Sequence, residues 1–198
     1  MVVSHEHKYV YIAIPKTACQ AVSQWLVEKH GGEYVRPCTH RWWPPEGCEQ
    51  YLVFTVVRNP YERCFSWWWY GCREPNRREA NAEIWGMSFP EFMRERIGRK
   101  DNAPIDPETG RPNTAMTQAR FFELSGASRF VRYEALEGLS DLQFVEVFNG
   151  LPRRNVTVTK PKQAFQAYFE GDSQAEDLVW EYCREDFEAF GYERARTQ

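Results

Sequence analysis

The sequence predicts a single α/β domain with a mainly parallel sheet flanked by helices. Two stretches, Tyr9–Ile14 and Leu52–Val57, are continuous apolar runs rich in β-branched and aromatic residues, the pattern of strands buried on both faces. Each run is followed by a segment with helical signals, and such alternation is typical of parallel sheets. The length of 198 residues fits one domain, so we expect a single domain over residues 1–198.

The first strand leads through a tight turn into a helix. Pro15 ends the apolar run, and apolar residues recur at helical spacing from about Cys19 to His30. Gly31 and Gly32 follow as a stop signal, because glycine readily takes the left-handed conformation that ends many helices. The beginning of the chain is therefore predicted to be a strand, a tight loop and a helix.

The second strand leads into a helix in a similar way. Asn59 is a good N-cap residue and Pro60 suits the first helical position, so a helix is predicted from there to about Tyr70. Within it, the three adjacent tryptophans at 67–69 point in different directions. We therefore expect most of them to pack in the core, with at most one or two facing a cleft.

Later elements are predicted from capping signals and composition. Phe130 and Val131 indicate a short strand. Between Gly98 and Thr114, a stretch rich in Pro, Gly and Asp has no periodicity, which predicts a long loop: either a lid or substrate loop, or a disordered segment. Three capping boxes mark helix starts: Ser88 with Glu91, Ser140 with Gln143, and Ser173 with Glu176.

Composition argues against several classes of protein. The net charge of −3 gives no overall attraction to nucleic acid or to anionic membranes, so an anion site must be built locally. The sequence shows no apolar run as long as a membrane span and no signal-peptide core in residues 1–8. We therefore expect a cytoplasmic or otherwise soluble protein without a membrane partner. The six cysteines include no CxxC pair, which favours free thiols over disulfides and argues against a zinc site.

Lys16 and Thr17 lie where open parallel sheets bind ligands, in the turn between the carboxyl end of a strand and the next helix. The first N–H groups of a helix attract phosphate or sulfate, and Lys16 adds a positive charge beside them. Ala18 is small, which lets a ligand approach the backbone. A kinase-type P-loop needs glycines before its lysine, and residues 10–15 contain none, which argues against nucleoside triphosphate chemistry.

A second group of polar residues follows the second strand. Arg58 stands at the carboxyl end of that strand, and Arg63 and Ser66 share a face of the following helix. An arginine, a hydroxyl and a helix start can converge on one phosphate. Taken alone, the segment is better explained by an Arg63 that pairs with a nearby acid and a Ser66 that faces solvent.

Taken together, the two groups resemble the motifs of the sulfotransferases that use 3′-phosphoadenosine 5′-phosphosulfate (PAPS), especially the carbohydrate-sulfotransferase-like branch. Residues 15–21 (PKTACQA) are similar to the family's 5′-phosphosulfate loop, P-K-T-x-x-[TSQ]-[ST], except that Ala21 replaces a hydroxyl residue. Residues 58–66 (RNPYERCFS) match the 3′-phosphate motif, R-[DN]-P-x-x-R-x-x-S, at every fixed position. Residues 132–136 (RYEAL) and 186–192 (DFEAFGY) resemble two later motifs of the branch.

The resemblance implies a P-loop-like sulfotransferase fold and in-line transfer of a sulfuryl group to an acceptor hydroxyl, with a glycan as the favoured acceptor. It implies no metal, and the sequence suggests no nucleic-acid partner. Lys16 would be catalytic, because it would stabilise the charge on the leaving group. Arg63 would either assist in binding or brace its helix. The residues implied to bind PAPS, or its product PAP, are Lys16, Thr17, Ala18, Cys19, Gln20, Arg58, Arg63 and Ser66.

The acceptor must lose a proton, so a general base is expected. We favour His40, which lies between the two cofactor motifs, where several members of the branch carry a histidine. Glu62 and Glu134 are the other candidates.

Two other functions stay open: a P-loop phosphotransferase, and a degenerate sulfotransferase that binds nucleotide or glycan without turnover. The missing glycines argue against the first. The difference from the family's 5′-phosphosulfate loop at residues 19–21 keeps the degenerate sulfotransferase open. The retention of Lys16, Arg58 and Ser66 argues against it.

Overall fold

The structure is a computed structural model, and it describes residues 1–35, 43–98, 115–136 and 173–194. The described chain forms two compact units. Unit 1 contains the described residues up to 58 together with 115–136, and unit 2 contains 59–98 together with 173–194. The chain contains both helices and strands, with parallel strands among them, so the predicted α/β class is confirmed.

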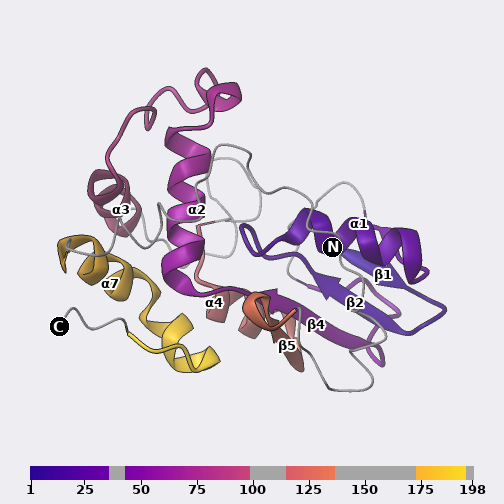
Figure 1. Ribbon diagram of the computed structural model, residues 1–198. Coiled ribbons are helices and arrows are strands. Elements are labelled where there is room, and N and C mark those ends of the chain that lie inside the picture. Colours follow the sequence, from indigo (N-terminus) through magenta and orange to yellow (C-terminus); the bar gives the residue numbers. More distant parts are fainter. Residues whose placement is uncertain (36–42, 99–114, 137–172, 195–198) are drawn as a thin grey trace. The chain divides into compact units, whose positions relative to one another are not determined.

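Unit 1 is built on a five-stranded sheet with the order β3-β1-β2-β4-β5 (Figure 1). Strands β2, β4 and β5 are parallel, whereas β1 is antiparallel to both β2 and β3. The sequence predicts the three parallel strands, and the structure confirms them. It does not predict β1 and β3, because such short segments show no periodic pattern. The strands are β1 (Val2–Ser4), β2 (Tyr9–Ile12), β3 (Glu33–Tyr34), β4 (Leu52–Val57) and β5 (Arg129–Arg132).

Strand β2 is buried on both faces, as its apolar run predicts. On one face Tyr11 packs in a cluster with Trp25 of helix α1 (Cys19–Lys29). On the other face Val10 packs in a second cluster with Cys48. Helix α1 therefore covers one face of the sheet, and its hydrophobic side supplies much of the core of unit 1.

The ends of the helices in unit 1 follow local backbone rules. Helix α1 ends where predicted: the N–H groups of His30 and Gly32 both donate to Leu26 O at 3.1 Å, and Gly31 is left-handed with φ 58°. Helix α4 (Gln118–Ser125) begins after the N-cap Thr117, whose hydroxyl accepts a hydrogen bond from Arg120 N. The sequence does not predict α4, because a helix of eight residues shows too little periodicity.

Unit 2 is helical in its described part. It contains α2 (Pro60–Cys72), a 3-10 turn η1 (Pro75–Arg77), α3 (Phe89–Gly98) and α7 (Ser173–Phe190). The three α-helices enclose an apolar cluster whose members include Phe65 of α2, Phe92 of α3 and Val179 of α7, and Figure 1 shows these helices in magenta and yellow. Burial of such side chains stabilises the packing by about 1.5–3 kcal/mol each.

Helix α2 begins as its sequence predicts. Asn59 Oδ1 accepts a hydrogen bond from Tyr61 N at 3.0 Å, and Pro60 occupies the first turn. Trp68 is buried, and its Nε1 donates to Met87 O at 2.9 Å. The neighbouring tryptophans, 67 and 69, pack against the same cluster. The prediction that most of this run packs in the core is confirmed.

The capping box before α3 is confirmed. Ser88 N donates to Glu91 Oε2 at 2.7 Å, and Glu91 N donates to Ser88 Oγ at 3.4 Å. The hydrogen bonds from Ser88 lower the pKa of Glu91. Helix α7 begins at the predicted residue, Ser173. The box of Ser140 with Gln143, and the loop predicted up to Thr114, lie outside the described residues.

Two expectations from composition can be compared with the described residues. Their cysteines, 19, 48, 64, 72 and 183, are free thiols. In these same parts of the chain, no helix combines the length and apolar character needed to cross a bilayer.

Candidate anion-binding site

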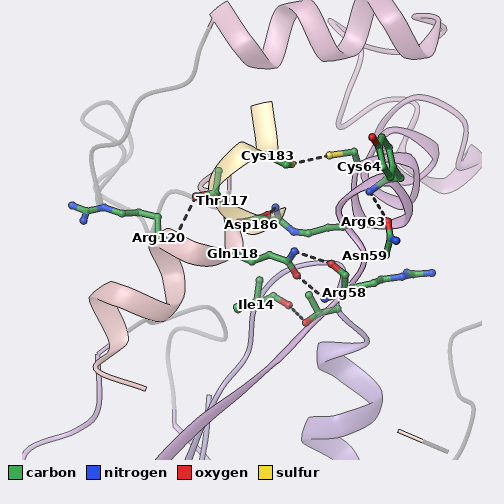
Figure 2. Close-up of polar contacts among 12 residues, drawn as sticks. Ile14, Arg58, Asn59, Arg63, Cys64, Thr117, Gln118, Arg120, Cys183 and Asp186 are labelled. Carbon is green, nitrogen blue, oxygen red and sulfur yellow. Dashed lines mark hydrogen bonds and ion pairs between the residues drawn. The ribbon is translucent and has the colours of Figure 1, made fainter. Parts of the chain in front are cut away.

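The turn between β2 and α1 has an unusual backbone. Lys16 and Ala18 both take the left-handed conformation, with φ 70° and 62°, which costs a non-glycine residue on the order of 1 kcal/mol or more. Thr17, between them, is fully buried and its hydroxyl donates to Ile14 O at 2.9 Å (Figure 2). Left-handed residues beside right-handed ones turn N–H groups to one side, as in anion-binding nests. The strain is therefore consistent with a binding turn.

The N-terminus of α1 continues this turn. Ala18 is its N-cap, no described side chain caps the helix, and the described residues of the first turn include no acid. The first-turn N–H groups and the helix dipole thus favour an anion, without competition from a carboxylate. Lys16 is half-buried and Gln20 is exposed at this end of the helix. The predicted binding residues of this segment therefore share one turn.

The thiol and the phenol beside this turn are neutral at ordinary pH. Burial raises the pKa of Cys19, the first residue of α1, and the nearby Lys16 lowers it by a smaller amount. Burial also raises the pKa of Tyr11 well above its usual value. Neither group brings a negative charge to the turn, which therefore keeps the positive charge of Lys16.

Arg58 joins the same part of unit 1. It follows β4, which is the parallel neighbour of β2, so the carboxyl ends of the two strands meet at one edge of the sheet. Its Nη1 donates to Lys16 O at 3.5 Å, and its guanidinium lies 4.8 Å from the ring centroid of Tyr133. Arginine held on an aromatic face keeps its donors directed in a plane. The structure thus brings the first predicted motif and the arginine of the second together.

The remaining residues of the second motif belong to unit 2. Arg63 of α2 is only 1% exposed, and its Nη1 lies 3.9 Å from Oδ2 of Asp186 in α7, which is fully buried. Ser66 is half-buried on the same helix as Arg63. Beside the ion pair, Cys64 Sγ and Cys183 Sγ lie 3.5 Å apart. Of the two roles considered for Arg63, the burial and the ion pair favour bracing of its helix.

Of the three candidates for the general base, the structure describes Glu62 and Glu134. His40 lies outside the described residues, so its predicted role stays a prediction. Glu62 is half-buried on α2, and Glu134 is exposed after β5, in the 3-10 turn η2 (Tyr133–Ala135). The predicted binding roles of Arg63 and Ser66 likewise stay predictions.

Three residues that contact predicted site residues have no predicted role of their own. Gln118 bonds the backbone of Arg58, Tyr133 stacks on its side chain, and Asp186 pairs with Arg63. Tyr133 and Asp186 both lie in motifs that the resemblance identifies, so the sequence pointed to their segments but not to their contacts. For Gln118 the only signal is the N-cap residue Thr117 before it, which marks a helix and not a contact.

Comparison with known proteins gives one match. The model of the Sulfotransferase family matches residues 1–194, which includes described residues of both units. No curated protein and no solved structure matches the chain.

Proposed function

Because the chain belongs to the sulfotransferase family, we propose that it transfers a sulfuryl group from PAPS to an acceptor hydroxyl, with a glycan as the favoured acceptor. The observation that carries the proposal is the contact of Arg58 with Lys16 at the carboxyl ends of two parallel strands. A strained turn, the positive end of a helix dipole and two cations together suit a ligand with two anionic groups. PAPS is such a ligand.

The turn at 15–20 fits the 5′ end of PAPS. Lys16 supplies a charge, and the first N–H groups of α1 supply donors, while Thr17 holds the turn through its bond to Ile14 O. When bound, PAPS supplies the sulfuryl group, which leaves the bridging oxygen of the 5′-phosphate as it bonds to the acceptor oxygen. Lys16 is proposed to stabilise the negative charge that is left on that bridging oxygen.

Arg58 and Ser66 are proposed to hold the 3′-phosphate. The guanidinium of Arg58 offers several donors in one plane, which suits a phosphate. Ser66 adds a hydroxyl, as the resemblance to the 3′-phosphate motif implies. Arg63 is proposed to act indirectly, because it is buried and forms an ion pair with Asp186.

His40 is proposed as the base that takes the proton of the acceptor hydroxyl, with Glu62 and Glu134 as the alternatives. A positioned base typically contributes about 10²–10⁴-fold to the rate. The His40→Ala variant should therefore lose turnover and retain PAP binding. A fully active variant would transfer the assignment to one of the two glutamates.

The proposal is tested first by a thermal-shift titration with PAP, beside ATP with Mg²⁺ and beside AMP. Ligand at about 100 times its Kd stabilises the folded protein by about 2.7 kcal/mol, so PAP should raise the melting temperature in a dose-dependent way. A shift with ATP and Mg²⁺ alone would favour a phosphotransferase, and no shift with PAP would contradict the PAPS site. Transfer of ³⁵S from labelled PAPS to a panel of glycans would then separate an enzyme from a binder without turnover.

A further inference from the structure

The side chain of Gln118 forms two hydrogen bonds with the main chain of a single residue, Arg58. Gln118 Oε1 accepts from Arg58 N at 2.8 Å, and Gln118 Nε2 donates to Arg58 O at 2.9 Å (Figure 2). Gln118 is fully buried, although it stands sixty residues away in the sequence. We propose that Gln118 is a positioning residue for recognition of the 3′-phosphate, acting through Arg58. This inference rests on the proposed function.

The position of Arg58 explains why such a contact is needed. The pairing of β4 with β5 ends at Val57, opposite Arg132, and Asn59 then caps α2. Arg58 therefore lies between the last paired residue of β4 and the start of a helix. The amide of Gln118 offers one acceptor and one donor, as a neighbouring strand would. Gln118 therefore pairs with Arg58 as a strand neighbour would, one residue beyond the last paired residue of β4.

Gln118 is itself held firmly. It is the first residue of α4, directly after the N-cap Thr117, which is 2% exposed and accepts a hydrogen bond from Arg120 N. Phe121, one turn later, is fully buried. A side chain that is buried on a capped helix has little conformational freedom, so Gln118 can hold the backbone of Arg58 in one position.

The two ends of Arg58 are held by different groups. Gln118 fixes the backbone, and the Tyr133 ring and Lys16 O contact the guanidinium. A rotation of the Arg58 peptide would move the guanidinium away from both contacts, because the side chain extends several ångströms from its Cα. Loss of the Gln118 amide should therefore weaken binding of the phosphate that Arg58 recognises, and spare the 5′ end.

Gln118→Met tests the inference, because methionine keeps the length of the side chain and removes both hydrogen bonds. The Kd values of PAP and AMP would be measured by isothermal titration calorimetry; AMP differs from PAP only by lacking the 3′-phosphate. We expect PAP to bind about tenfold more weakly, because the N–H and C=O groups of Arg58 would lose their partner and the residue would move to regain hydrogen bonds. AMP affinity should change less than twofold. The matched control is Gln24→Met on α1, where the amide donates to the Glu28 carboxylate, and neither Kd should change.

A double variant distinguishes positioning from general destabilisation. If Gln118 acts through Arg58, Gln118→Met should have no further effect on PAP affinity once Arg58→Ala is present. Equal losses of PAP and AMP affinity, additive losses in the double variant, or unchanged PAP affinity in folded Gln118→Met would each overturn the inference.

A second substitution covers the case in which Gln118→Met does not fold. Gln118→Glu keeps an oxygen that accepts from Arg58 N and loses the donor to Arg58 O, so it should show the same selective loss for PAP. If neither variant folds, Gln118 has a structural role and the inference is wrong. If the unmodified protein does not bind PAP at all, the proposed function itself fails, and the two failures are thereby distinguished.

Discussion

The two arginines of the segment 58–66 have opposite surroundings. Arg58, in unit 1, is half-buried, stacks on Tyr133 and contacts the carbonyl of Lys16. Arg63, in unit 2, is 1% exposed and lies against the fully buried Asp186. One motif in the sequence thus contains one arginine suited to a ligand and one suited to the fold. A match to a motif therefore does not give all of its residues the same role.

The surrounding residues of each unit show the same difference. Around Arg58 the turn is strained, with left-handed Lys16 and Ala18, and the N-cap Ala18 of the helix after it forms no side-chain cap among the described residues. Backbone strain reduces stability and is typical of binding sites. Around Arg63, α2 begins with a side-chain cap at Asn59 and packs in a large apolar cluster. We infer that unit 1 contributes more to binding and unit 2 more to stability.

The largest expected effect is on stability, from Arg63→Met. The substitution leaves the buried carboxylate of Asp186 without its cation, which costs about 3–5 kcal/mol in comparable buried pairs. Denaturant unfolding followed by circular dichroism measures this loss. The control is Arg184→Met, which removes an exposed pair with Glu188 and should cost less than about 0.5 kcal/mol. Equal, small effects of the two substitutions would contradict the role of Arg63 as a brace.

The next effect is on catalysis, from Lys16→Ala. If Lys16 stabilises the leaving group, kcat should fall by about 10²-fold or more, because comparable groups contribute about 2.7–4 kcal/mol to the transition state. Transfer of ³⁵S from PAPS under saturating donor measures it. Lys29→Ala, in the last turn of α1, is the control and should keep full activity. A near-normal kcat in Lys16→Ala would remove this residue from the mechanism.

A smaller effect is expected on PAP affinity, from Arg58→Ala. Hydrogen bonds from a charged donor contribute about 1.5–3 kcal/mol, so the Kd of PAP should rise by roughly 10- to 100-fold. The unfolding free energy should change much less than in Arg63→Met, since Arg58 is half-buried. The calorimetric Kd and the unfolding midpoint are measured on the same sample. If Arg58→Ala lost stability and kept its PAP affinity, Arg58 would have the structural role that is assigned here to Arg63.

The smallest effect is expected one residue further along, from Asn59→Ala. The substitution removes the N-cap of α2, in which Asn59 Oδ1 accepts from Tyr61 N, and should cost about 1 kcal/mol of stability. PAP affinity should stay within about twofold, because the Asn59 side chain is engaged in the cap and is given no role in binding. Asn59→Asp keeps the capping oxygen and is the matched control. A loss of PAP affinity as large as in Arg58→Ala would show that Asn59 takes part in binding as well as in capping.

Local patterns in the sequence were sufficient for the elements that local rules determine. The apolar run at 52–57 predicts β4 with its observed bounds, and Asn59 with Pro60 predicts the start of α2. The box of Ser88 with Glu91 predicts the start of α3. These features depend on neighbours within a few residues, so their physical cause is contained in the sequence. Strands β1 and β3 are too short for such a signal.

The sequence by itself determined the α/β class, the turn at Lys16 and the family, because each depends on a local pattern or on a motif of fixed spacing. Only the tertiary structure decided which partner each polar side chain has. It directed the amide of Gln118 to the backbone of Arg58, placed Tyr133 against its guanidinium, and buried Arg63 with Asp186. These contacts join residues that are far apart in the chain, and the packing that brings them together is a property of the whole core rather than of any segment.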